Sequence, residues 1–454
     1  TEDGVHGFAE VEAGRFDFRR GVLGLTARTD RTDLSFSISR TETDGFSASA
    51  AGTEDDGFNS TQANLYLRHQ FTDVFAAGLS ALYTDSEVEF DEGAATGDGL
   101  PPFDEFTEAE SYGVRAFAEL TAGAFEHEVA LSYFENERNT FTNGFTFSFE
   151  GERRRIEYRG SYDTGGIWAL NFGGDYEEEE NLNQKIDITG VQAELLVAPT
   201  DALDLAVSVR NDDHSEFSSE LSSRAALAWR IQDDLILRAS ASDGFRAPTL
   251  SELGPSFGDP DFKPETSISY ELGVEKRFAT DGFIKATLFH TEIDDDIFFD
   301  GSSTNCPAAT PTFPGCFEAA DFESQGIELS GQVAINAFLT LTGAYTYTDA
   351  ERDGVTASRV PEHDVVLGLG AQITPRLDAQ FTVQHAAGFV TGFFDPPVNN
   401  VGDYTVFHVN AGYTVSDNVD AFLRVENLFD EDYETAGGFN TPGRAAYVGL
   451  RASF

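Results

Sequence analysis

The chain has 454 residues, and its 79 acidic residues against 29 lysines and arginines give a formal net charge of −50. This balance excludes nucleic acid as a partner, because phosphates bind basic surfaces. No run of about 18 apolar residues is present, so no membrane-spanning helix is predicted. The sequence lacks an initiator methionine and a signal peptide, and we expect it to begin inside a longer precursor.

Apolar residues alternate with polar or small ones through most of the chain. Clear examples are the segments 203–210, 339–348 and 407–415. Because side chains of a strand point to opposite faces in turn, this period of two predicts strands with one apolar face. A water-soluble sandwich would show the same alternation, so the period leaves both kinds of fold open.

Short turns alternate with long polar segments along the chain. The predicted short turns are 29–33, 71–73, 121–124, 163–166, 199–202, 232–234, 279–282, 335–337, 374–376 and 416–418. The predicted long loops are 42–58, 85–108, 136–149, 176–185, 211–221, 243–263, 294–321, 349–358, 385–404 and 430–443. This asymmetry is typical of an outer-membrane barrel. We therefore predict an all-β protein, a transmembrane antiparallel β-barrel of about 22 strands forming one domain over residues 1–454.

The last strand of the predicted barrel ends the chain. Its apolar face consists of Ala446, Val448, Leu450, Ala452 and Phe454. An apolar face that ends in an aromatic residue at the carboxy terminus is what a closing barrel strand would present to lipid.

Four stretches resemble motifs of the TonB-dependent outer-membrane receptors. They are Asn-Leu-Phe-Asp-Glu-Asp-Tyr-Glu-Thr at 427–435, Asp-Gly-Phe-Arg-Ala-Pro-Thr-Leu at 243–250, Phe-Lys-Pro-Glu at 262–265 and Gln-Gly-Ile-Glu-Leu at 325–329. The resemblance implies a monomeric barrel in the lipid of a Gram-negative outer membrane that imports a scarce ligand. Energy would come from TonB acting on a plug domain. The family's plug and TonB-contacting segment have no counterpart here, so this sequence resembles the barrel portion only.

Within this family the likeness is strongest to the vitamin B12 (cobalamin) receptors. It is carried by Thr-Glu-Asp-Asp-Gly-Phe at 53–58, the strand at 65–73 and the segment 210–217. The resemblance implies cobalamin as the ligand. A siderophore or another metal chelate is the alternative within the class. A passive pore without a plug, or a surface binding protein, is the alternative outside it.

Acidic residues gather in two of the predicted loops, 42–58 and 85–108. Calcium binds six to eight oxygen atoms, which such loops can supply, although solvated acidic loops need no ion. The cobalamin receptors carry a calcium cage in these loops. Carried over position by position, the resemblance implies calcium ligands at Asp44, Glu54, Asp56, Asp91 and Asp104. Glu54 departs from the family, which has Asp there.

Cysteines and loop aromatics supply the remaining predicted features. Cys306 and Cys316 are the only cysteines and lie in one proline-rich segment, which predicts a disulfide in an oxidising compartment. Three loop aromatics are predicted ligand contacts: Phe257, Phe393 and Phe394. The sequence carries no nucleophile elbow, phosphate loop or zinc spacing, so we expect no enzymatic activity.

Overall fold

The computed structural model describes residues 4–50, 52, 54–91, 105–142, 144–181, 184–254, 256–279, 282–301, 303–309, 315–388, 390 and 401–454. Within these ranges all 23 regular elements are strands, and they belong to one sheet. β18 (Val355–Thr356) is a two-residue strand that pairs with β17 alone, beyond the barrel wall. The other 22 strands form the barrel, which confirms the predicted number.

The barrel strands are β1 (Gly4–Gly14), β2 (Arg19–Arg28), β3 (Thr32–Phe46), β4 (Asp56–Thr72), β5 (Phe75–Glu89), β6 (Phe106–Ala122), β7 (Phe125–Thr142), β8 (Phe145–Asp163), β9 (Trp168–Asn181), β10 (Gln184–Thr200), β11 (Leu203–His214), β12 (Glu220–Gln232), β13 (Leu235–Arg246), β14 (Glu265–Arg277), β15 (Phe283–Asp300), β16 (Cys316–Asn336), β17 (Leu339–Arg352), β19 (His363–Thr374), β20 (Leu377–Ala387), β21 (Tyr404–Ser416), β22 (Val419–Glu426) and β23 (Ala445–Ser453).

The sheet closes between its first and last strands. β1 pairs antiparallel with β23 from Phe8 opposite Ser453 to Gly14 opposite Tyr447. The buried carboxylate of Glu10 lies between Arg451 of β23, at 2.5 Å, and Arg20 of β2, at 2.6 Å. Because closure leaves no strand edge unpaired, the backbone can satisfy its hydrogen bonds within lipid.

The outer face of the barrel is apolar and exposed, as alternation requires. On β10 and β11, Val191, Leu195 and Val207 retain 62%, 41% and 51% of their accessible surface. The intervening residues Gln192 and Glu194 line the interior. An apolar belt of this kind faces hydrocarbon in a membrane barrel. The prediction of a transmembrane barrel is confirmed.

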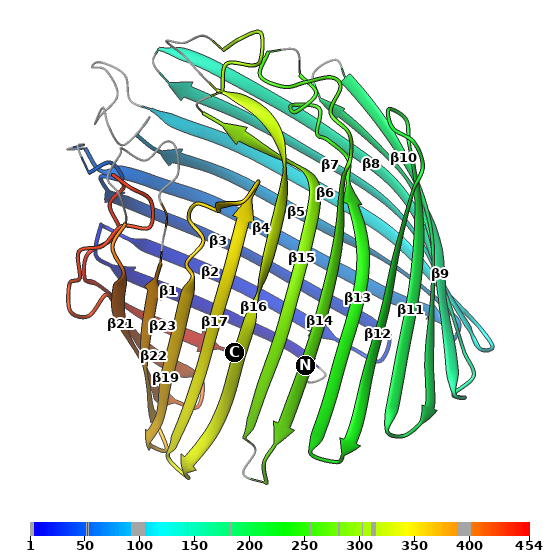
Figure 1. The fold of residues 1–454 in the computed structure, drawn as a ribbon. Coiled ribbons are helices and arrows are strands. Elements are labelled where there is room, and N and C mark those ends of the chain that lie inside the picture. The colour runs from blue at the N-terminus through cyan, green and yellow to red at the C-terminus, as the bar shows by residue number, and fades with distance from the viewer. Residues whose placement is uncertain are drawn as a thin grey trace.

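The two ends of the barrel differ. Tight turns gather at one end and longer connections at the other (Figure 1). All ten predicted short turns join consecutive strands. Among the described residues, no helix is long and apolar enough to cross a bilayer.

Two predicted long loops are wrong. Segments 136–149 and 176–185 are mostly strand, because β7 continues to Thr142 before β8 begins at Phe145, and β9 continues to Asn181 before β10 begins at Gln184. Cross-strand pairs such as Arg153 with Glu179 extend the ladder with polar side chains. Polar composition was therefore a poor guide to where pairing ends.

Candidate functional site

Three of the predicted calcium ligands come together at the end of the barrel that carries the longer connections. Glu54 and Asp56 precede and begin β4, and Asp91 follows the last residue of β5 by two. β4 and β5 are paired up to Phe58 opposite Val88, so their ends are neighbours. One carboxylate oxygen from each of the three residues lies within 4.8 Å of the others. We call these residues the acidic group.

Backbone donors hold two of these carboxylates in place. The N–H of Ala48 donates to Asp56 Oδ2 at 2.5 Å, and the N–H of Ser49 donates to Asp91 Oδ2 at 2.8 Å. Asp91 is only 6% exposed, and its second oxygen, Oδ1, is buried with no hydrogen-bond partner among the described residues. A buried carboxylate oxygen without a partner is costly, and a bound cation would satisfy it.

The segment that supplies these donors is fixed from its other side by the last loop of the chain. Ser49 forms an isolated antiparallel bridge with Phe439. The side-chain amide of Asn440 donates to the carbonyl of Ser47 at 2.9 Å and to that of Ser49 at 3.0 Å. The acidic group is thus attached to the loop that carries the family-like motif at 427–435.

Burial and like charge act together on Asp56. β4 has 17 residues, more than the 9–11 that a tilted strand needs to cross, so this end stands clear of the membrane. Burial raises the pKa of Asp56, the charges of Asp91 and Glu89 raise it further, and the N–H of Ala48 opposes them. The environment of Asp56 therefore disfavours its negative charge, and a nearby cation would favour it.

The structure does not place every predicted ligand in the acidic group. The side chain of Asp44 is exposed and lies outside the group, and its backbone N–H donates to the carbonyl of Phe16. Asp44 lies where the pairing of β3 with β4 shifts register, between Thr43 and Phe46. Three predicted site residues lie outside the described residues: Asp104, Phe393 and Phe394.

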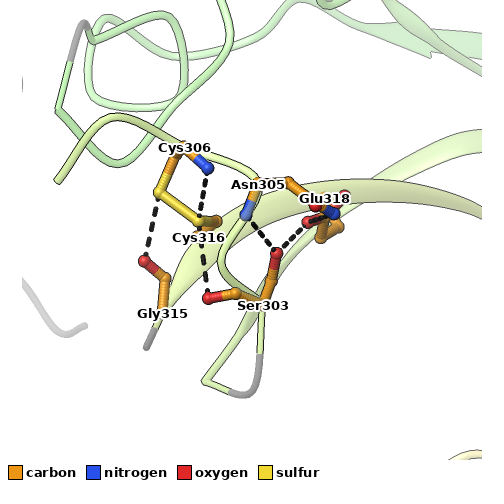
Figure 2. The surroundings of a disulfide bond; sticks show 6 residues. All are labelled: Ser303, Asn305, Cys306, Gly315, Cys316 and Glu318. Carbon is orange, nitrogen blue, oxygen red and sulfur yellow. Dashed lines mark hydrogen bonds between the residues drawn. A yellow bond between two sulfur atoms is a disulfide. The ribbon is translucent and has the colours of Figure 1, made fainter. Parts of the chain in front are cut away.

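The predicted disulfide between Cys306 and Cys316 is confirmed, with a Cα–Cα distance of 5.7 Å. Both cysteines are buried, and Cys316 is the first residue of β16. Figure 2 shows Ser303 and Asn305 beside the bond, both hydrogen-bonded to the carboxylate of Glu318. The bond and these contacts fold the segment back onto the start of β16.

Phe257 lies against this disulfide-closed segment. Its carbonyl accepts a hydrogen bond from the N–H of Phe317 at 2.8 Å, and the carbonyl of Ser256 accepts one from the N–H of Ala308 at 3.0 Å. The Phe257 side chain remains 50% exposed. The backbone is therefore fixed while the ring stays accessible to a ligand.

An ion-paired anchor at Arg246 was not predicted. Its guanidinium contacts the buried carboxylates of Glu252, at 3.0 Å, and Glu265. Glu265 also accepts a hydrogen bond from the N–H of Ile297 at 2.7 Å. The anchor fixes the segment that follows β13. The arginine stands in the motif at 243–250, but its two partners follow only from the fold.

The family of the chain follows from a comparison with known proteins. The family model described as TonB dependent receptor-like, beta-barrel, matches residues 8–428. The chain belongs to this family. This receptor barrel therefore lies in the outer membrane of a Gram-negative bacterium.

Curated relatives are named for more than one ligand. The receptor barrel is 25% identical over 392 residues to the vitamin B12 transporter BtuB of Photobacterium profundum, covering 83% of this chain and 61% of that protein. It is 25% identical over 298 residues to the ferric enterobactin receptor PirA of Pseudomonas aeruginosa, covering 55% and 39%. The chain thus spans less than two thirds of the length of these relatives.

Solved structures share the fold at low sequence identity. The ferric enterobactin receptor PfeA of Pseudomonas aeruginosa matches with a TM-score of 0.84 at 15% identity, over all of this chain and 81% of that one. The siderophore receptor PirA of Acinetobacter baumannii matches with a TM-score of 0.82 at 16% identity, over all of this chain and 81% of that one. At these identities the likeness concerns the fold alone.

Proposed function

We propose that this barrel is the membrane-spanning part of a receptor that binds cobalamin at its extracellular loops and carries it across the outer membrane, driven by TonB through a plug domain. The barrel forms and breaks no bond in its ligand. Support comes from the family and from the B12 transporter relative, which aligns with 83% of the chain. The acidic group at the loop end is the observation that carries the proposal, because it provides a place where a cation can order the ligand-binding loops.

Calcium is the proposed occupant of the acidic group. Oxygens bound to one Ca²⁺ at about 2.3–2.6 Å lie at most about 5 Å apart, and the three carboxylate oxygens lie within 4.8 Å of one another. Asp91 Oδ1, which has no hydrogen-bond partner among the described residues, adds a buried oxygen to the group. Glu54, Asp56 and Asp91 therefore fit a hard cation that takes oxygen ligands.

Bound calcium would supply positive charge, and residues of the chain would hold its ligands in position. Without a cation, three close carboxylates repel one another and favour separation of the two loops. The N–H groups of Ala48 and Ser49, together with the bridge to Phe439, hold one side of the group in position. A ligand that contacts only the ordered loops binds more tightly when the cation is present, and linkage makes this coupling reciprocal.

Uptake by cells tests the transport function. The complete gene, expressed in a strain that lacks its own cobalamin receptor, should restore uptake of labelled cobalamin only when TonB is present. Uptake of a ferric chelate in place of cobalamin would show that cobalamin is the wrong ligand, while TonB-dependent uptake would stand. Uptake of many small solutes without TonB would instead support a passive pore.

A siderophore or another metal chelate is the second candidate ligand. It is favoured by the relative named as a ferric enterobactin receptor, which aligns with 55% of this chain. Binding of labelled cobalamin in competition with ferric enterobactin would separate the two. A surface binding protein without transport would bind its partner but show no TonB-dependent uptake.

A further inference from the structure

A cavity of about 690 Å³ lies against the inner wall of the barrel near the end with the longer connections. Interior-facing side chains of β7–β11 and β13 line it, together with the segment 247–251 that follows β13. Asn181 is the last residue of β9 and His214 the last of β11, which places the cavity at the end that a ligand from outside reaches first. We call this cavity the upper chamber.

Most charged groups of the upper chamber are paired with one another. Three arginines and four carboxylates form one chain of ion pairs: Arg153, Arg155 and Arg210 with Asp175, Glu177, Glu179 and Asp212. The N–O distances run from 2.6 Å for Arg153–Glu179 and Arg210–Asp212 to 3.7 Å for Arg153–Glu177. Each guanidinium contacts at least two carboxylates, so a polyanion entering the chamber would have to displace a partner from an arginine.

Several other polar atoms of the same chamber have no hydrogen-bond partner among the described residues. Of the seven buried side-chain atoms without a hydrogen bond among the described residues, four belong to chamber residues: Asn136 Oδ1, Arg155 Nε, Asn181 Oδ1 and His214 Nε2. Native proteins leave few such atoms unsatisfied, so four around one cavity indicate a place where polar groups of a ligand or of the plug can bind.

The imidazole of His214 shows which kind of contact it offers. The residue is only 5% exposed, and its Nδ1 accepts a hydrogen bond from the backbone N–H of Glu216 at 3.1 Å. In a neutral ring the proton therefore sits on Nε2, the atom without a partner. The chamber thus presents two unpaired donors, at His214 and Arg155, and two unpaired acceptors, at Asn136 and Asn181.

We propose that the upper chamber is a binding subsite for uncharged amide or hydroxyl groups of the transported ligand. A primary amide carries both an acceptor oxygen and N–H donors, so different amides of one ligand can pair with His214 and with Asn181. The satisfied ion pairs and their excess carboxylate select against polyanionic chelates such as ferric catecholates. This subsite rests on the proposed uptake function and narrows its substrate class to uncharged, amide-rich or hydroxyl-rich chelates.

Contacts within the chain hold the segment 247–251, which lines one side of the upper chamber. Arg246 holds the start of the segment 247–251 through its pairs with Glu252 and Glu265. Thr249 is also held in place, because its N–H donates to Glu252 Oε2 at 2.7 Å. A preorganised wall lowers the ordering cost of binding.

The test uses the complete receptor, plug included, with cyanocobalamin as the amide-rich probe and a ferric catecholate as the polyanionic one. Asn181→Leu and His214→Phe keep bulk while removing a contact, and Asn181→Ala serves as a milder variant if Asn181→Leu does not fold. Each variant should bind cyanocobalamin about 3- to 10-fold more weakly, the effect of one lost hydrogen bond. The control is Asn171→Leu, on the interior face of β9 nearer the turn end, where the amide already donates to Glu194 at 2.9 Å. It should leave the affinity unchanged.

The possible outcomes separate this subsite from the proposed function. Tight cyanocobalamin binding that both chamber variants leave unchanged overturns the subsite and keeps the function. Weakened binding of a different uncharged chelate, with no cyanocobalamin binding in the wild type, keeps the subsite and removes the cobalamin assignment. Binding of the ferric catecholate alone, unaffected by the variants, overturns both. A lower melting temperature of the variants with unchanged ligand affinity would assign the chamber to the plug and overturn the subsite.

Discussion

The disulfide-closed segment and the acidic group lie at the same end of the barrel, yet they are stabilised in different ways. The first is closed by the Cys306–Cys316 bond, and Ser303 supplies a hydroxyl to Glu318. The second brings together three carboxylates, and Asp91 keeps a buried oxygen without a partner among the described residues. The chain completes the first region by itself, whereas we propose that a cation completes the second.

Removing one charge from the acidic group should have the largest effect. In the complete receptor, calcium at about 100 times its Kd should slow hydrogen exchange of the 47–58 backbone about 100-fold, since binding then stabilises the ordered loop by about 2.7 kcal/mol. Asp91→Asn keeps the shape of the side chain and removes its charge, so the slowing should be lost. Hydrogen exchange followed by mass spectrometry measures both proteins.

Asp44→Asn is the matched control for this comparison. Its side chain lies outside the acidic group, so the calcium effect should remain. Loss of the calcium effect in Asp44→Asn would show that the ligand set carried over from the family is right and that the observed grouping is incomplete. An unchanged calcium effect in Asp91→Asn would remove the acidic group as a calcium site.

Breaking the disulfide should have an effect of similar size that is confined to its own region. The bond links residues ten apart, and opening such a ring frees the segment by about 3 kcal/mol in the chain-entropy account. Cys306→Ser with Cys316→Ser should speed hydrogen exchange from 303 to 317 and, through the contacts at Phe257, around 256–257. Exchange at 47–58 and its response to calcium should not change. Spreading of the effect to that segment would show that the two regions are coupled.

Asn440→Ala should weaken calcium binding by a smaller amount, because it removes hydrogen bonds to the segment 47–49 and leaves the carboxylates in place. The side-chain amide makes two hydrogen bonds, to the carbonyls of Ser47 and Ser49. One bond is exposed and the other half-buried, so their loss costs about 0.5 kcal/mol each, and calcium should bind roughly 5-fold more weakly. Isothermal titration calorimetry with calcium checks this value. An unchanged affinity would mean that the last loop has no part in ordering the acidic group.

Much of the barrel could be predicted because its signals are local. Alternation along each strand and the ten tight turns fix the strands one hairpin at a time. The disulfide also followed from sequence, since Cys306 had a single possible partner. The assignment of residues 1–454 to one domain stays a prediction.

The site could be predicted only in part, because it depends on register and on which side of the wall a residue faces. Asp44 belongs to the acidic stretch of sequence, but it lies at a register shift of β3 and its exposed side chain is outside the acidic group. The ion pairs that extend β8 and β9, and the unpaired atoms of the upper chamber, arise between strands whose relative positions no single stretch encodes. The polar composition of 136–149 and 176–185 predicts loops, but strand ends beyond the membrane need no apolar face, and these segments stay mostly paired.

The most direct test of the account is the affinity of the complete receptor for cobalamin, measured with calcium and with a chelator. If calcium orders the loops that hold the ligand, affinity should be about 5- to 150-fold higher with calcium, a coupling of roughly 1–3 kcal/mol. Asp56→Ala should bring the two values together. An affinity that the chelator leaves unchanged in the wild type would contradict the account and reduce the acidic group to surface charge.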